Sequence, residues 1–244
     1  MRILCMLPAA RGVYPPEAEE RRLNLMRSYT TLATQVDADY MPAVSGFSPW
    51  GGSEGAAPPD ASARAAQLSA QRAIQAEQEG YDAFCPFGTL DIGVRQARQL
   101  VKIPVVGQAE ACFLFCGLLH QPFASCSYMP GGEDRIRTWA RDTGVEPLLV
   151  ANTAIGIPNA EYLQRRQELL ERFMACVQAA REKGATLMGL VAMSICPTEY
   201  SATELSEASG MPVLDALACQ IALAEWWHRT GLPPSLLRCP RSAP

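Results

Sequence analysis

The chain has 244 residues and a formal net charge of −4 at pH 7, with 48% hydrophobic and 19% charged residues. This composition is typical of a globular protein with a buried core. The acidic balance, and the lack of a Lys/Arg cluster beside aromatic residues, argue against a nucleic-acid partner. No apolar run reaches the ~18 residues that a membrane-spanning helix needs, so we expect no membrane association.

Apolar runs of strand length alternate with helical patterns from the N-terminus onward. The first run, at 3–7, is shorter than the apolar core of a signal peptide and ends at Pro8, so we expect a buried strand in a cytoplasmic protein. The other expected strands lie at 83–87, 105–106, 123–128, 147–150, 187–193 and 212–214. The expected helices lie at 17–35, 61–78, 92–100, 109–119, 131–143, 159–183, 198–209 and 215–230. This alternation predicts an α/β fold with parallel sheets covered by helices.

Two local signals refine this prediction. The stretch at 43–61 is rich in Gly, Ser and Pro and has no helical period, so we expect a long loop. Such loops serve as lids or binding loops, or are tolerated insertions, and the sequence leaves both open. Ser201 and Glu204 have the spacing of a capping box and predict a helix start.

Nine cysteines are scattered along the chain without a disulfide framework, so we expect free thiols in a reducing compartment. There is no C-x-x-C pair, and His120 and His228 are the only histidines, so we expect no metal site. A pyridoxal phosphate enzyme needs a Schiff-base lysine. Lys102 lies just ahead of a strand and Lys183 at a helix end, and neither position suits that role. We therefore expect no cofactor.

One half of the sequence resembles the other. Sixteen residues separate Gly88 from Pro104 in the first half, and sixteen separate Cys196 from Pro212 in the second. The matched spacing indicates an internal pseudo-twofold in which Gly88 and Cys196 are equivalent. A cleft between two such halves would carry a thiol on one wall and no side chain on the other.

Four segments place turns directly after apolar strands, at 7–12, 87–89, 125–128 and 195–198. Open α/β sheets bind ligands at the carboxyl ends of their strands. Free backbone N–H groups at these turns, with the hydroxyls of Thr89, Ser127, Tyr128 and Thr198, would form a neutral cradle for a carboxylate.

Several short motifs, together spanning most of the chain, are similar to those of the aspartate/glutamate/hydantoin racemase superfamily. They are EAEERRL at 17–23, EGYDA at 79–83, IPVVGQAEA at 103–111 and GMPVLD at 210–215. The resemblance implies two pseudo-symmetric lobes, each a mainly parallel sheet flanked by helices, with the active site in the cleft between them. It also implies a cofactor-independent enzyme in which cysteines on opposite walls move a proton at a carbon next to a carboxyl or carbonyl.

The sequence departs from this two-cysteine pattern. Aligned on 79–83, the first cysteine of the superfamily falls on Gly88, which resembles arylmalonate decarboxylase, where a single cysteine in the second lobe remains. The resemblance makes Cys196 the catalytic acid that protonates an enediolate, with a small carboxylate or a cyclic imide as substrate. The implied substrate-binding residues are Pro8, Gly88, Thr89, Ser127, Tyr128, Pro197 and Thr198. A short insertion must precede Cys196, because counting from Gly184 places the second cysteine near Ala192. We also expect a helix start after Cys196 to lower the pKa of its thiol.

Alternatives stay open at this point. A shifted loop that presents Cys85 to the cleft would make a two-cysteine hydantoin or amino-acid racemase from Cys85 and Cys196, whereas Cys85 is otherwise a buried strand residue. A chain that lost one thiol could also be a non-catalytic carboxylate-binding member of the family. We expect lobe 1 to comprise 1–119 with 215–244, and lobe 2 to comprise 120–214. The sequence leaves a homo-oligomer open.

Overall fold

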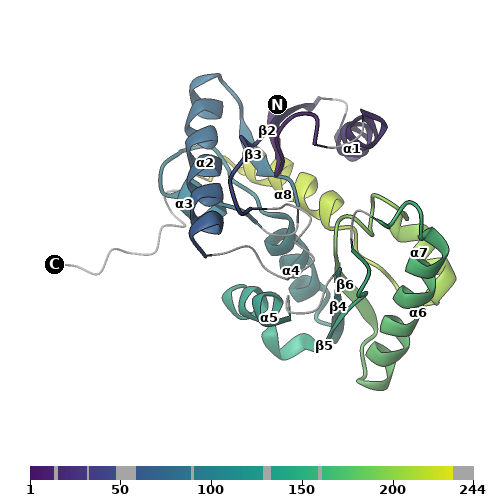
Figure 1. The fold of residues 1–244 in the computed structure, drawn as a ribbon. Helices are drawn as coiled ribbons and strands as arrows, with labels where there is room; N and C mark the ends of the chain where they lie inside the picture. The colour runs from purple at the N-terminus through teal and green to yellow at the C-terminus, as the bar shows by residue number, and fades with distance from the viewer. Residues whose placement is uncertain are drawn as a thin grey trace. The chain divides into compact units, whose positions relative to one another are not determined.

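The computed structural model describes residues 1–13, 16–31, 33–47, 59–88, 91–128, 133–158 and 161–232. Figure 1 shows strands and helices alternating along the chain. The chain divides into a first unit (Met1–Phe47, Pro58–Gln108 and Gln220–Pro244) and a second unit (Ser48–Ala57 and Ala109–Cys219). We describe each unit by itself, and the lobe boundaries expected from the sequence stay a prediction.

The first unit is built on a parallel three-stranded sheet in the order β2-β1-β3. The strands are β1 (Arg2–Leu7), β2 (Gln35–Tyr40) and β3 (Ala83–Pro86). Within this sheet Cys5 pairs with Ala38 on one side and with Cys85 on the other. An isolated parallel bridge from Phe84 to Val105 continues the sheet beyond β3.

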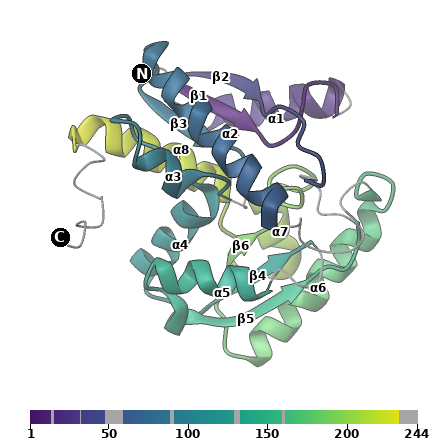
Figure 2. The ribbon, with the colours of Figure 1, turned by 60° about the vertical axis from the view of Figure 1, so that its left-hand side comes forward.

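Helices cover the sheet of the first unit. They are α1 (Pro16–Ser28), α2 (Pro59–Gln78), α3 (Val94–Arg98) and α8 (Ala216–Thr230), the last of which begins in the second unit. Figure 2 shows α2 running across β1 and β3. Small buried alanines on α2, such as Ala65 and Ala73, let it pack closely on Leu4, Met6 and Phe84.

The second unit has a parallel sheet in the order β5-β4-β6. The strands are β4 (Phe123–Ser127), β5 (Leu149–Ala154), which follows the short helix η1 (Glu146–Leu148), and β6 (Leu187–Val191). On one face, Ala124 and Met188 pack with residues of α6 (Arg166–Glu182) and α7 (Ala202–Ser209). On the other, Phe123 packs with residues of α4 (Gln108–Leu119) and α5 (Glu133–Asp142).

The predicted fold class is confirmed, because both sheets are parallel and flanked by helices. The capping box is confirmed as well: Ser201 Oγ accepts from the N–H of Glu204 (3.1 Å), whose carboxylate accepts from the N–H of Ser201 (2.7 Å). Most of the loop expected at 43–61 lies outside the described residues. Among the described residues, no helix is long and apolar enough to cross a membrane.

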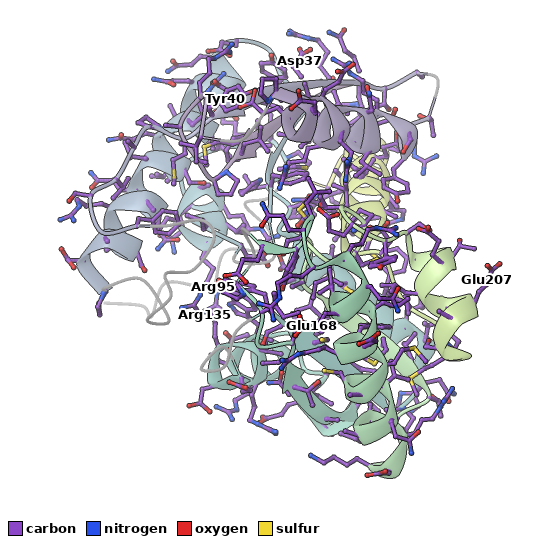
Figure 3. All side chains as sticks on the ribbon, turned by 45° about the vertical axis from the view of Figure 1, so that its right-hand side comes forward. Asp37, Tyr40, Arg95, Arg135, Glu168 and Glu207 are labelled. Carbon is purple, nitrogen blue, oxygen red and sulfur yellow. The ribbon has the colours of Figure 1, made fainter. Side chains whose placement is uncertain are left out.

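One strand was missed. The helix expected at 17–35 ends at Ser28, and β2 follows it. Because β2 is an edge strand, it carries polar residues on one side, where Asp37 accepts from the hydroxyl of Tyr81 (3.0 Å) and Asp39 pairs with Arg72. Figure 3 labels Asp37 and Tyr40 on this strand. These polar residues obscure the apolar run that identifies a buried strand.

Candidate active site

Three strand ends are joined at one edge of the sheet in the second unit. The N–H of Ala192, just after β6, donates to the carbonyl of Cys126 in β4 (2.8 Å). The N–H of Ile155, just after β5, donates to the carbonyl of Ser127 (2.9 Å). This carboxyl edge is where ligands bind in open α/β sheets. It carries the predicted residues Ser127, Tyr128, Cys196, Pro197 and Thr198.

Cys196 lies in a buried turn that leaves β6. Its N–H donates to the carbonyl of Ala192 (3.0 Å), and the N–H of Tyr200 closes the turn on the carbonyl of Ile195 (3.0 Å). Cys196 is 1% exposed, and its peptide bond to Pro197 is cis. Thr198 is also buried in this turn.

Burial raises the pKa of the Cys196 thiol well above its ordinary value, and the nearby Asp215, Cys219 and Glu204 raise it further. The expected lowering is therefore wrong. The reason is local: residues 193–199 form turns and α7 begins only at Ala202, so the expected helix does not start directly after Cys196. Cys196 is consequently a protonated thiol at neutral pH and suits the role of proton donor.

Tyr128 and Ser127 supply hydroxyl groups at the end of β4. Burial raises the pKa of the Tyr128 phenol, and Arg135 on α5, labelled in Figure 3, opposes the rise. Tyr128 therefore stays a neutral hydrogen-bond donor at neutral pH. Ser127 Oγ donates to the carbonyl of Thr153 (3.3 Å), which fixes its orientation.

Pro8 and Gly88 come together at the carboxyl edge of the sheet in the first unit. The N–H of Phe87 donates to the carbonyl of Met6 (2.8 Å), which joins the ends of β3 and β1. A Cβ at Gly88 would lie 3.9 Å from Cγ of Pro8. Gly88 has φ +113°, a conformation that side-chain-bearing residues rarely adopt. Thr89 lies outside the described residues.

Two buried glutamines hold this end of the first sheet. The N–H of Gly88 donates to Oε1 of Gln108 (2.9 Å). Nε2 of Gln220 donates to the carbonyls of Pro86 (2.8 Å) and Val106 (2.7 Å). Both glutamines are fully buried. The sequence patterns predict no role for either glutamine, although Gln108 is a polar residue inside the largely apolar IPVVGQAEA motif, which is a signal for a buried polar contact.

Cys85 lies within β3 rather than in the turn that follows it. Its side chain is fully buried, and contact with the Cys5 thiol, together with burial, raises the pKa of Cys85 well above its ordinary value. The thiol is therefore part of the interior of the first unit.

The two units repeat the same hydrogen bonds over different chain lengths. The N–H of Phe84 donates to the carbonyl of Pro104 (2.9 Å), and the N–H of Met188 donates to that of Pro212 (2.8 Å). Twenty residues separate the first pair and 24 the second. The second connection is thus four residues longer.

One extra residue is a bulge at Gly189, which the pairing of β4 with β6 skips. A Cβ at this position would lie 2.5 Å from Sγ of Cys116, so only glycine fits. The other three lie between Ala192 and Pro212. When residues are counted forward from the equivalent strand ends, Phe87 and Ala192, Gly88 corresponds to Met193. When they are counted back from the equivalent prolines, Pro104 and Pro212, Gly88 corresponds to Cys196.

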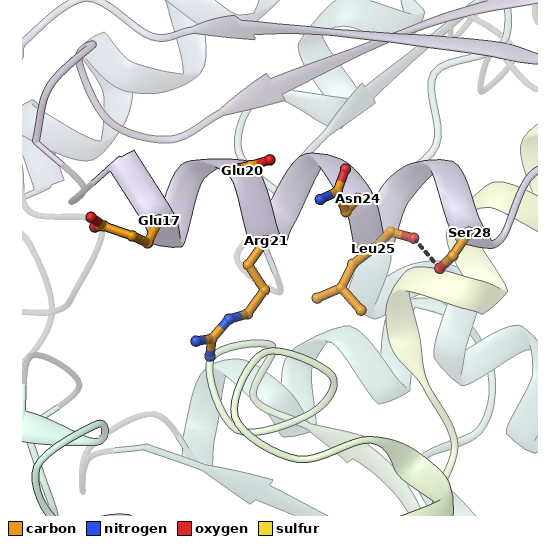
Figure 4. A pocket seen from close by; sticks show the side chains of 6 residues that line it. All are labelled: Glu17, Glu20, Arg21, Asn24, Leu25 and Ser28. Atoms are coloured by element: carbon orange, nitrogen blue, oxygen red, sulfur yellow. Dashed lines mark hydrogen bonds between the residues drawn. The ribbon is translucent and has the colours of Figure 1, made fainter.

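Two surface hollows are lined by other residues. One runs along α1, and Figure 4 shows its lining residues Glu17, Glu20, Arg21, Asn24, Leu25 and Ser28. The other lies beside β5 and α6 in the second unit and includes Arg172 and Cys176. Neither is lined by a residue predicted for the site.

Comparisons with known proteins agree with this architecture. The chain is 27% identical over 155 residues to a hydantoin racemase from Rhizobium meliloti, an alignment that covers 62% of each chain. Its structure is similar to allantoin racemase from Pseudomonas fluorescens, with a TM-score of 0.82, 20% identity, and 100% and 99% of the two chains covered. It is also similar to arylmalonate decarboxylase, with a TM-score of 0.62, 14% identity, and 95% and 94% covered. The family model Asp/Glu/hydantoin racemase matches residues 23–224, and the chain belongs to this family.

Proposed function

We propose that the protein is a cofactor-independent enzyme that forms an enolate or enediolate at a carbon next to a carboxyl or carbonyl, and that Cys196 protonates this carbon. The observation that carries the proposal is the position of Cys196: a buried thiol, held protonated, at the carboxyl edge of a parallel sheet. Family membership supports this class of chemistry, because its relatives include racemases, isomerases and decarboxylases.

The protonation step follows from the relative acidities of the two groups. The S–H bond of Cys196 breaks, its proton forms a C–H bond with the enolate carbon, and the electron pair stays on sulfur. A carbanion beside a carbonyl is more basic than a thiolate, so even a thiol with a raised pKa gives up its proton to it. The thiolate then forms in a buried site near Asp215, which favours its return to the protonated thiol.

The substrate oxygens need hydrogen-bond donors while negative charge develops on them. We propose that the neutral phenol of Tyr128 supplies one, with Ser127, Thr198 and Pro197 as further binding residues of the second unit. Pro8 and Thr89 stay binding residues proposed from the sequence. The raised pKa of Tyr128 supports this role, because the phenol keeps its proton at neutral pH.

The proposal uses one thiol. The position corresponding to the first cysteine of the superfamily is Gly88, and the Cys85 thiol is buried inside the first sheet. A single donor delivers its proton to one face of the enolate, which favours a product of one handedness. In a decarboxylase the enolate forms as the bond from the α-carbon to a carboxylate breaks and carbon dioxide leaves; in an isomerase a base first removes the α-proton. A two-cysteine racemase using Cys85 and Cys196 remains the alternative; the relatedness to a hydantoin racemase favours a cyclic imide as substrate in that case.

The test is turnover by the wild type, Cys196→Ala and the matched control Cys176→Ala on a panel of 5-substituted hydantoins, allantoin and arylmalonates. We expect Cys196→Ala to lose roughly 10²–10⁴-fold in kcat, the usual contribution of a general acid, and Cys176→Ala to keep its kcat. Full turnover by Cys196→Ala would remove the proposal. A wild type that binds these compounds without turning any over would favour a non-catalytic binding protein.

A further inference from the structure

We infer that Gln108 is a substrate-binding residue whose Nε2 donates a hydrogen bond to an oxygen of the bound substrate. The inference rests on the proposed function and extends it with a residue for which the sequence predicted no role. Three observations carry it: the fixed orientation of the Gln108 amide, the unpartnered state of its Nε2 and the rigidity of its surroundings.

The backbone fixes which way the Gln108 amide faces. The N–H of Gly88 can only donate, so the side-chain atom 2.9 Å from it must be the oxygen, Oε1. The NH₂ group is then the other arm of the same planar carboxamide. Rotating the amide would leave the Gly88 N–H facing another donor, so the geometry selects one orientation.

Nε2 of Gln108 is buried and has no hydrogen-bond acceptor among the described residues. A buried donor without an acceptor is unfavourable, and most such groups in folded proteins have a partner. Gln108 lies beside Gly88, which follows β3 at the edge where ligands bind in open α/β sheets. A substrate carboxylate or carbonyl oxygen is an acceptor of the kind that this donor lacks.

The surroundings of Gln108 are held in place independently. Gln220 donates to the carbonyls of Pro86 and Val106, which lie close to Gly88 and Gln108 along the chain. These two hydrogen bonds secure both segments at the end of the first sheet. A donor on such a rigid support contributes affinity with little ordering on binding.

The decisive variant is Gln108→Glu, which keeps an oxygen for the Gly88 N–H and replaces the Nε2 donor with a second oxygen. Its matched control is Gln71→Glu, which makes the same chemical change on the exposed side of α2. Binding of 5-benzylhydantoin and of phenylmalonate is measured by calorimetry, alongside the melting temperature and, for any compound turned over, kcat and KM.

We expect Gln108→Glu to bind the better probe about 10- to 100-fold more weakly, with the loss in KM rather than kcat, and Gln71→Glu to match the wild type. If Gln108→Glu fails to fold, Gln108→Met keeps the apolar volume without a donor, and the same weakening is expected. Two results would overturn the inference. One is a folded Gln108→Glu that binds the probes with wild-type affinity, as expected if Nε2 bonds only to a water molecule. The other is a wild-type protein that binds neither probe. Cys196→Ala in the same assay separates the proposed function from the proposed role of Gln108. If Cys196→Ala is inactive while Gln108→Glu binds and turns over the probes like the wild type, only the role of Gln108 is removed.

Discussion

Asp215 lies near Cys196 in the second unit, and its negative charge helps to hold the thiol in its protonated form. The carboxylate is itself anchored, because Oδ1 accepts from the N–H groups of Leu217 (2.9 Å) and Ala218 (3.1 Å) at the start of α8. A helix N-terminus therefore fixes an anion, and the anion acts on the thiol. The sequence predicted a different arrangement, in which a helix start acts directly on Cys196 and lowers the pKa of its thiol.

Asp215→Asn should lower the pKa of Cys196. Asn caps helices as well as Asp does, so we expect stability to change by less than about 1 kcal/mol. The measurement is the pH midpoint of Cys196 alkylation by iodoacetamide, followed by mass spectrometry. Glu207→Gln, on the exposed side of α7 (Figure 3), is the matched control and should leave the midpoint unchanged. An unshifted midpoint in Asp215→Asn would show that the carboxylate has no influence on the thiol.

Stability should fall in alkaline solution. Burial raises the pKa of the Cys196 thiol. The pKa of the Cys126 thiol is raised chiefly by its hydrogen bond with Cys176 and further by burial. A pKa raised in the folded state contributes stability below the unfolded pKa of ~8.5, and this is lost as pH rises toward the folded pKa. Each such thiol lowers the free energy of unfolding by up to about 1.4 kcal/mol per pH unit in that window. Urea unfolding at pH 7.5 and pH 10 measures the change, and equal stabilities would contradict it.

Tyr128→Phe should impair catalysis without unfolding the protein. Removing one donor to a developing oxyanion typically lowers kcat by about 10²–10³-fold. Tyr200→Phe is the matched control, because the Tyr200 hydroxyl donates to the carbonyl of Arg166 (2.7 Å) and serves the structure. Its expected cost is about 1 kcal/mol of stability with unchanged kcat. Equal kcat in Tyr128→Phe and the wild type would exclude the phenol from the reaction.

Among the eight cysteines of the described part of the chain, Cys176 should be alkylated first near neutral pH. Hydrogen bonding with Cys126 lowers the pKa of Cys176 to about 7, with help from Thr153 and Arg172, and Cys176 lines the hollow beside α6. Peptide mapping after brief iodoacetamide treatment at pH 7.5 measures this order. Modification of Cys196 ahead of Cys176 would show that the raised pKa of Cys196 is wrong.

The sequence predicted the fold where strands are almost entirely apolar, as in β1, β3 and β6, and where caps are local, as at Ser201. It missed β2, whose polar residues suit an edge strand. Gly88 and Cys196 correspond only when residues are counted back from Pro104 and Pro212, because three extra residues lie between Ala192 and Pro212, after the bulge at Gly189.

The surroundings of the predicted site residues cannot be read from the sequence. The direction of the Cys196 pKa depends on burial and on Asp215, which is 19 residues away in the sequence. The hydrogen bond of Gln108 with Gly88 joins residues 20 apart. Neither relationship leaves a local pattern, since both arise from tertiary packing.

The central claim is that Cys196 gives the product its new proton. The most direct measurement is deuterium incorporation at the product α-carbon in D₂O, with Cys176→Ala as control. We predict one deuterium in a product of one handedness for the wild type and the control, and no incorporation above background for Cys196→Ala. Equal deuteration by Cys196→Ala and the wild type would contradict the claim.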